Sequence, residues 1–281
     1  MTNGEAGDFE RDVELLWQRG DEPTRSGLNR DRIVRAAIDV ADAEGLAGLS
    51  MRKVAERLGF TTMSLYRHVP GRDQLVDLMR DAVIEIPPET KPDLGWRPRI
   101  EECVRRGWAL RVRHPWLAEV RGTRHVPGPN AVALYEHMLG IVADTGLSPA
   151  EVIATIGLIG RFVDAEALVL VETAESERDS GVSETEWWGS RDALYARLDS
   201  YPTLTRLWEA GGYDQPEDSL EFGLARMLDG IELLIRKRDE SRDETSCAIC
   251  GKPIAQPTSG RPRSYCSRAC QQRAYRERST G

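Results

Sequence analysis

The chain of 281 residues carries a formal net charge of −8 and contains 40% hydrophobic and 30% charged residues. This composition is typical of a soluble globular protein with one or two domains and tails. No apolar run approaches the length of a membrane span, and the N-terminus lacks a basic-then-apolar signal pattern, so we expect a cytoplasmic protein with no membrane partner. Strand signals are scarce and helical periodicity is nearly continuous from Asn29 to Lys237, which predicts an all-α fold.

The first 27 residues are mostly acidic, with one short amphipathic stretch from Phe9 to Trp17. We expect residues 1–27 to form a partly disordered extension. The alternative is an arm that lies over DNA or a partner subunit and brings Arg25 and Arg30 near phosphates.

Two short helices joined by a tight turn are predicted between Ser50 and Arg72. Ser50 is a good N-cap, and Gly59 stands where a helix commonly ends in a left-handed residue. Ala55 is small enough for two helices to cross closely, and Pro70 ends the second helix. This layout is typical of a helix-turn-helix motif, whose second helix enters the DNA major groove.

The same stretch is a basic patch on an acidic chain. It has a single acid, Glu56, and its basic residues are Arg52, Lys53, Arg57, Arg67 and Arg72. A local patch of this kind indicates an anionic partner. The alternative is a helical hairpin with a solvated basic face, but the capping residue, turn glycine, small residue and charge together favour DNA binding.

Further helices are predicted on both sides of the motif. Asn29–Gly45 should pack across its two helices, and Arg72–Ile84 should follow it. Pro87 and Pro88 then break the chain before a hinge or loop at Glu89–Gly95. We therefore place a DNA-binding domain at residues 28–86.

The stretch IVRAAIDVADAEGLAGLSMRKVAERLGFTTMSLYRHVPGRDQLVDLM resembles the N-terminal DNA-binding domain of the TetR family of bacterial repressors. The match covers about fifty residues, and its LYRHV segment is most similar to the tetracycline-repressor branch. The resemblance implies base or phosphate contacts for Arg52, Thr62, Met63, Ser64, Tyr66, His68 and Arg72. With Ser50 and Arg67, these residues form the predicted DNA-binding set. Arginine can hydrogen-bond guanine, hydroxyl groups reach phosphates, and methionine can touch a thymine methyl group.

A second helical domain is predicted at residues 96–238. Its longer amphipathic segments are Ile100–Val112, Asn130–Ala143, Ser148–Val171 and Pro216–Lys237. We expect a loop over Glu172–Glu186 and short helices over Trp187–Leu198 and Thr203–Trp208. The two longest apolar stripes, on 148–171 and 216–237, exceed what a small domain needs. As the resemblance implies, they would form a four-helix interface in a homodimer; the alternative is ordinary core.

The resemblance also implies that the helical domain binds a small-molecule inducer. Candidate lining residues are Cys103, Trp108, Trp116, Tyr135, Arg161 and Asp164. Arg161 and Asp164 are three residues apart on an otherwise apolar helix, so they either pair with each other, which we favour, or meet a ligand. The residues by which the tetracycline-repressor branch binds its drug–magnesium chelate do not align here, so the inducer is unidentified.

Four cysteines near the C-terminus, Cys247, Cys250, Cys266 and Cys270, have the spacing C-x2-C-x15-C-x3-C. Cys250 is followed by Gly251, which predicts a knuckle whose backbone N–H groups point at the sulfurs. Together with a helix turn at the second pair, this spacing predicts a closed structural Zn²⁺ site in a tail at residues 245–281. Disulfides are the alternative, which a reducing cytoplasm disfavours.

The tail is also basic. Its arginines are Arg261, Arg263, Arg268, Arg273, Arg276 and Arg278, with the single acid Glu277 and interleaved Tyr265 and Tyr275. It could be a second nucleic-acid contact, or a solvated segment that binds the acidic N-terminal extension or a protein partner. The sequence leaves these interpretations open.

Together these features predict a homodimeric transcriptional regulator, a repressor by resemblance, that binds a palindromic double-stranded operator and is released by a small-molecule inducer. The alternative is a zinc-tail adaptor or architectural protein that uses the helix-turn-helix for less specific DNA binding. We expect no enzyme, because the sequence has no glycine-rich phosphate loop, no H-E-x-x-H motif and no Ser-His-Asp set that spacing unites.

Overall fold

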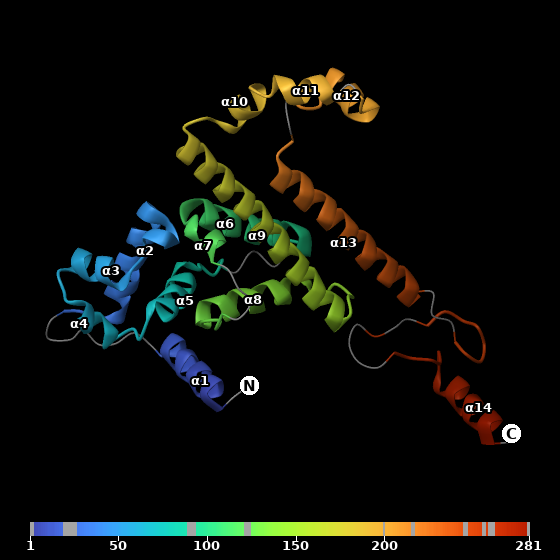
Figure 1. The fold of residues 1–281 in the computed structure, drawn as a ribbon. Coiled ribbons are helices and arrows are strands. Elements are labelled where there is room, and N and C mark those ends of the chain that lie inside the picture. Colours follow the sequence, from blue (N-terminus) through green and yellow to red (C-terminus); the bar gives the residue numbers. More distant parts are fainter. Residues whose placement is uncertain are drawn as a thin grey trace.

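The computed structural model describes residues 3–18, 27–88, 94–120, 125–198, 200–214, 217–243, 247–254, 257 and 262–279. These residues form helices and contain no β-strand, so the predicted all-α fold is confirmed (Figure 1). The helices are α1 (Asn3–Trp17), α2 (Arg30–Gly48), α3 (Met51–Leu58), α4 (Thr62–Tyr66), α5 (Arg72–Val83), α6 (Trp96–Arg113), α7 (Trp116–Glu119), α8 (Pro129–Val142), α9 (Pro149–Ser180), α10 (Glu184–Gly189), α11 (Asp192–Leu198), α12 (Pro202–Glu209), α13 (Ser219–Asp243) and α14 (Arg268–Ser279). None of the described helices combines the length and apolar character that a bilayer crossing requires.

Helices α2 to α5 form a head around one apolar core. Val54 of α3, Leu65 of α4 and Leu75 of α5 are fully buried in it. The Ser50 side chain accepts a hydrogen bond from the backbone N–H of Lys53, and α3 ends at Gly59 with φ of +73°. The two helices and the turn of the predicted motif are therefore present, with the cap and the left-handed glycine where the sequence places them.

Helix α2 runs past its predicted end. Gly45 has φ of +69° and interrupts the helix, which then continues to Gly48. The backbone N–H of Leu46, freed by the interruption, donates to Oε2 of Glu119 on α7 at 2.9 Å. A distant carboxylate thus satisfies a group that the kink would otherwise leave unpaired.

The short helix α7 joins the head to the rest of the protein. Its Trp116 is fully buried in the head core, and the indole N–H donates to Oδ1 of Asp42 on α2 at 2.7 Å. Nδ1 of His114 lies 2.7 Å from the same Asp42 oxygen. These contacts seat the end of α6 and the whole of α7 on the side of α2.

A second core lies among α6, α8, α9 and α13. Ile100, Val142, Ile159 and Leu228 are at most 1% exposed in it. At the surface of this core, Arg97 of α6 pairs with Asp229 and Glu232 of α13. Hydrogen bonds to these two carboxylates raise the pKa of Arg97. The second core is therefore held by apolar burial, with ion pairs at its rim.

The predicted loop over Glu172–Glu186 is confirmed only at residues 181–183, because α9 and α10 take up the rest. Helix α9 continues to Ser180 and ends at Gly181, whose φ is +68°. The added residues are mostly exposed, so they carry no apolar stripe, but glutamate and alanine favour helix without one. The next helix, α10, starts with its own capping box from Ser183 and Glu186.

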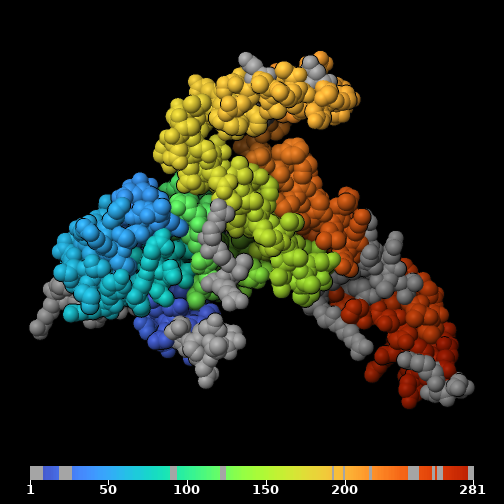
Figure 2. Space-filling view, viewed as in Figure 1, coloured from blue at the N-terminus to red at the C-terminus, as the bar shows by residue number. Residues whose placement is uncertain are grey.

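Helices α10 to α12 form an arm that projects from the body at the top of Figures 1 and 2. We call it the aromatic arm, because it exposes large ring side chains, which are Trp187, Trp188, Tyr201, Trp208 and Tyr213. At the C-terminal end of the chain, α14 follows the cysteine-containing segment, away from the head and the arm in the same view.

Helix α1 is longer than the predicted stretch from Phe9 to Trp17 and packs on the head. Leu16 is buried in the head core, and Nε2 of Gln74 on α5 donates to Oδ1 of Asp12 at 3.1 Å. The Arg30 guanidinium is 4% exposed and donates to the carbonyls of Leu15 and Gln18 at 2.6 Å each. Arg30 therefore binds the end of α1, whereas Arg25, its partner in the predicted DNA arm, lies outside the described residues.

Candidate DNA surface, cavity and cysteine cluster

Helix α4 presents a mixed apolar and polar surface. Met63 is 71% exposed and Tyr66 is 44% exposed, and Arg67 is also exposed just beyond the helix. Thr62, Ser64 and His68 are half-buried beside them. The inward residue of the helix is Leu65, which anchors it in the head core. This outward set offers a methyl group, a phenol and a guanidinium to a partner.

The other predicted DNA-binding residues are engaged within the head. Ser50 caps α3. Arg52 is exposed on α3, where a hydrogen bond from its Nε to Glu56 at 2.7 Å raises its pKa. Arg72 donates to the carbonyls of Leu46 at 2.8 Å and Leu49 at 3.3 Å, which ties the start of α5 to the end of α2.

A cavity of about 550 Å³ lies where the head meets the second core. Helix α5 forms one of its walls through Asp77, Arg80, Asp81 and Ile84. The other walls come from α6, α7, α8, α9 and the segment before α8, through residues that include Leu110, Arg111, Leu117, His125, Pro127, Leu134, Asp164 and Leu168. The cavity therefore borders the helix-turn-helix head directly.

Charged groups in the cavity are mostly paired across elements. Nε of Arg111 on α6 donates to Oδ1 of Asp164 on α9 at 3.1 Å. Nδ1 of His125 lies 3.0 Å from Oδ1 of Asp77 on α5. The cavity thus has an apolar lining with a basic–acidic pair at each of two places.

Asp81 connects the head to α8. Its side chain is buried, and its carboxylate accepts from the backbone N–H of Ala131 at 2.9 Å and of Asn130 at 3.3 Å. These are free donors of the first turn of α8, so a residue of α5 supplies the N-terminal cap of a helix in the other domain.

Of the six predicted lining residues, only Asp164 borders this cavity. It pairs with Arg111, so the interpretation that it pairs with Arg161 is wrong. Arg161 is exposed, and its guanidinium lies beside Gly157 of the same helix. Cys103 borders a smaller cavity of about 210 Å³, where burial raises the pKa of its thiol. The remaining three are Trp108 in the second core, Trp116 in the head core and Tyr135 at the surface.

Sequence reasoning did not identify Asp77, Arg111 or His125 as cavity residues. They belong to different elements that meet only in the folded chain, so no periodicity joins them. The available signal was the polar run Asp77, Arg80 and Asp81 on an amphipathic helix, which reads equally well as a solvated face.

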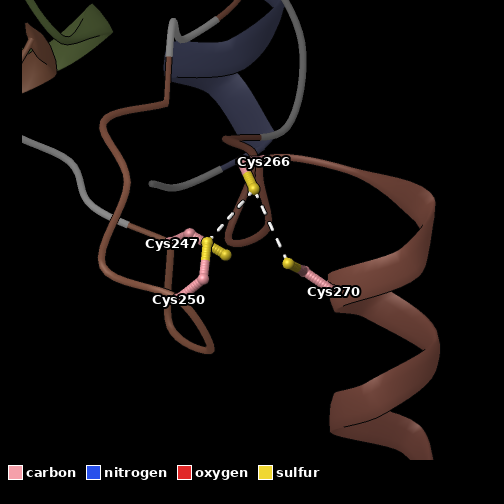
Figure 3. A group of neighbouring side chains, drawn as sticks. All are labelled: Cys247, Cys250, Cys266 and Cys270. Carbon is pink, nitrogen blue, oxygen red and sulfur yellow. Dashed lines mark hydrogen bonds between the residues drawn. The ribbon is translucent and has the colours of Figure 1, made fainter.

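The four C-terminal cysteines converge, as their spacing predicts (Figure 3). Their sulfur atoms all lie within 4.8 Å of one another, and Sγ of Cys266 lies 3.5 Å from that of Cys250 and 3.6 Å from that of Cys270. Four sulfurs placed tetrahedrally about 2.3 Å from one ion would be separated by about 3.8 Å. The cluster therefore has the dimensions of a four-thiolate metal site.

The backbone supports this cluster. The N–H of Gly251 donates to the carbonyl of Cys247 at 2.9 Å, closing the predicted knuckle, and Gly251 has φ of +68°. Hydrogen bonds from backbone N–H groups, foremost that of Cys266, lower the pKa of the Cys247 thiol to about 6. Hydrogen bonds to the sulfurs of Cys250 and Cys270 raise the pKa of Cys266 to about 12.

A helix-turn-helix head attached to a helical domain with a cavity at the junction defines a DNA-binding regulator of transcription. Residues 33–79 match the family model for bacterial regulatory proteins of the tetR family, and residues 87–235 match that for the tetracyclin repressor-like C-terminal domain. The chain belongs to the TetR family. Neither family model extends over the cysteine cluster.

Individual relatives agree with this assignment. The chain is 40% identical over 246 residues to the HTH-type transcriptional repressor DrrR1 of Streptomyces coeruleorubidus, covering 84% of this chain and 90% of that one. It is 27% identical to the class C tetracycline repressor of Escherichia coli, over 73% and 91% of the two chains. The crystal structure of Streptomyces coelicolor ActR in complex with actinorhodin superposes with a TM-score of 0.60 and 31% identity, covering 72% of this chain and 94% of ActR.

Proposed function

We propose that this protein is a cytoplasmic repressor that binds a palindromic operator as a homodimer and releases it when a small molecule occupies the 550 Å³ cavity. The observation that carries the proposal is that α5 of the head forms a wall of this cavity through residues that include Asp77 and Asp81. A molecule that enters the cavity therefore touches the DNA-binding unit itself.

The mechanism we propose is a population shift. A ligand that contacts α5, α6 and α8 together stabilises the arrangement in which those contacts are best. In that arrangement the two recognition helices of the dimer are no longer one DNA turn apart, so operator affinity falls. The similarity to ActR, solved with actinorhodin, supports a small-molecule effector.

The lining of the cavity restricts the chemistry of this effector. Leucine and valine side chains favour an apolar body, whereas the Arg111–Asp164 and Asp77–His125 pairs offer hydrogen bonds at its edges. A purely apolar molecule would remove these polar pairs from water without offering them new hydrogen bonds, which is costly. We therefore infer an effector with an apolar framework and several polar substituents.

For operator recognition we assign base contacts to Met63, Tyr66 and Arg67, which α4 and its end expose. Flanking polar residues contact phosphates, and these are Arg52, Thr62, Ser64 and His68. Ser50 and Arg72 support DNA binding indirectly. Ser50 caps α3, and Arg72 donates to a backbone carbonyl of α2. The DNA-binding unit in this assignment is residues 28–86.

The dimer interface we propose uses α9 and α13 within residues 96–238. Both helices bury one face in the second core, yet their other faces expose large apolar side chains, which are Ile153, Leu158, Val169, Leu170, Phe222 and Leu233. Apolar faces of this extent on neighbouring helices favour burial against a second copy. A homodimer also matches the two-fold symmetry of a palindromic operator.

We propose that the cysteine cluster binds Zn²⁺ as a closed structural site in residues 245–281. Support comes from the four converging sulfurs and from the small apolar content around them, since such a unit cannot fold without metal. The full-length protein should contain one zinc per chain, and Cys266→Ser should lose it. Cys103→Ser is the matched control, because Cys103 lies in the second core and not in the cluster.

The test of the main proposal is selection of bound fragments from a random DNA pool, with Tyr66→Ala as the control. We expect the wild type to enrich a palindrome with two half-sites and Tyr66→Ala to enrich it weakly or not at all. Equal enrichment by both proteins, or no sequence preference in the wild type, would show that α4 does not read an operator.

A further inference from the structure

We infer that the C-terminal module, residues 247–279, binds the phosphate backbone of duplex DNA beside the operator. The inference rests on the proposed zinc site, which would fix the shape of the module. It adds a second DNA contact outside the two matched domains, which end at residue 235.

The first argument is charge. From residue 247 to the C-terminus the chain has seven lysine and arginine residues and one acid, although the whole chain has a net charge of −8. Four thiolates with one Zn²⁺ contribute two negative charges, so the module remains positive when metal is bound. A cationic segment on an acidic protein is complementary to a polyanion.

The second argument is the outward face of α14. Cys270 faces the other cysteines (Figure 3), and Ala274, four residues further along the helix, is buried. The opposite side carries residues at helical spacings of four, seven and eight, which are Arg268, Gln272, Tyr275 and Arg276, with Arg273 at its edge. Guanidinium, amide and phenol groups are the side chains that contact phosphates and sugars.

The third argument is a hollow of about 530 Å³ at the start of α14. Arg263 and Arg268 border it together with the hydroxyl-bearing residues Ser264, Tyr265 and Ser267. Cationic and hydroxyl groups around one concave surface suit phosphate oxygens. The side chains of Arg268 and Arg273 form no ion pair or hydrogen bond with any described residue, so both remain available.

The fourth argument is position. In Figure 1, α14 lies at the lower right and the recognition helix α4 at the left of the view, and both are below the aromatic arm. Only residues 244–246 separate α13 from the module, so it stays close to the helical domain. When the head is bound, the module is held near the same duplex, which raises its effective concentration there. This favours duplex DNA over an RNA or a protein as the partner.

The experiment compares full-length, zinc-loaded wild type with Arg268→Gln/Arg273→Gln. Operator affinity is measured by fluorescence anisotropy over a series of salt concentrations, on duplexes with long flanks and with trimmed flanks. The slope of log affinity against log salt is negative, and each phosphate contact contributes about 0.9 to its magnitude. We expect the double variant to reduce this magnitude by about 2 for each module that contacts DNA. On the long duplex at low salt, affinity should fall on the order of tenfold; on the trimmed duplex the two proteins should converge.

The matched control is Arg178→Gln/Arg206→Gln. It removes the same charge from exposed residues at the end of α9 and in the aromatic arm, and should keep the wild-type slope. If the two double variants behave alike on the long duplex, the module does not contact DNA and the inference fails. This result would leave the proposed repressor function intact.

A scrambled duplex of the same length separates the two proposals. If the wild type does not prefer the operator to the scrambled duplex, the proposed function fails. The slope difference between the double variants on the scrambled duplex still decides whether the module binds DNA. Zinc content, measured for every variant, shows that the module is intact.

Discussion

The indole N–H of Trp17, the last residue of α1, donates to the backbone carbonyl of Pro127 at 3.2 Å. Pro127 belongs to the wall of the large cavity, whereas α1 is fastened to the head through Asp12 and Arg30. An N-terminal helix outside both matched domains therefore joins the DNA-binding head to the cavity wall. Movement of that wall relative to the head would strain this link.

The Trp17–Pro127 link predicts a local effect of Trp17→Phe. Phenylalanine keeps an aromatic ring in place but cannot donate, so the link is lost at a cost of about 0.5–1.5 kcal/mol. We expect faster hydrogen exchange, measured by mass spectrometry, in α1 and in residues 125–131. Trp188→Phe is the control: it removes an indole hydrogen bond to Glu184 in the aromatic arm. If both variants leave exchange in α1 unchanged, the link does not restrain the helix.

The buried carboxylate of Asp81 predicts a larger effect. Asp81→Ala leaves the backbone N–H groups of Asn130 and Ala131 without their acceptor, so the free energy of unfolding should fall by about 1–3 kcal/mol. Gly128→Ala should act on the same contact, because an added Cβ would clash with the carboxylate of Asp81.

Urea unfolding measures both variants at Asp81 and Gly128. The control is Asp144→Ala, which removes an exposed carboxylate and should change stability by less than about 0.5 kcal/mol. If Asp81→Ala is no more destabilising than this control, water replaces the lost acceptor and the cap does not hold α5 to α8.

Arg72 and Arg67 are predicted to separate stability from recognition. The Arg72 guanidinium bonds two carbonyls of the head, so Arg72→Gln should lower the unfolding free energy by about 1–2 kcal/mol. Arg67 is exposed and has no such bonds, so Arg67→Gln should leave stability unchanged and weaken operator binding. Thermal unfolding and anisotropy titration measure the two properties. A stable Arg72→Gln variant with weak operator binding would instead return Arg72 to the DNA contacts.

Local patterns were enough to predict the motif and the cysteine cluster. Ser50 and Gly59 act through neighbours close in sequence, and the four cysteines are brought together by a knuckle and a helix turn that their spacing indicates. The cavity depends on contacts such as Arg111 with Asp164 and Asp77 with His125, which join different helices. The way in which the helices cross decides which charged residues meet in the cavity. The sequence of a single helix does not contain this information.

The extent of α9 and α1 shows the same limit. Apolar periodicity ends near Val171, yet α9 continues because its exposed residues favour helix without packing. In α1, one of the contacts that hold the helix on the head comes from Arg30, which the sequence associates equally well with phosphates. Propensity at exposed positions and the choice between partners for an arginine are both weak signals in a single sequence.

The last prediction concerns pH and Glu151 at the start of α9. Hydrogen bonds from Arg238 and from the backbone N–H and hydroxyl of Ser148 lower the pKa of Glu151 to about 2. Because the folded-state pKa is depressed, the charged carboxylate stabilises the fold above its unfolded pKa of about 4.5, and this contribution is lost as pH falls toward 2. Wild type should therefore be more stable than Glu151→Gln at neutral pH, and the difference should shrink between pH 4.5 and 2.

Urea unfolding of both proteins at a series of pH values measures this difference for Glu151. Glu184→Gln is the control, since that glutamate lies in the first turn of α10, where its carboxylate accepts from Trp188 and pairs with no arginine of the described residues. The Glu151→Gln difference should also be smaller in an Arg238→Gln background, because the largest cause of the low pKa is then removed. A difference that stays constant down to pH 2 would mean that Glu151 acts through its shape as a cap and not through its charge.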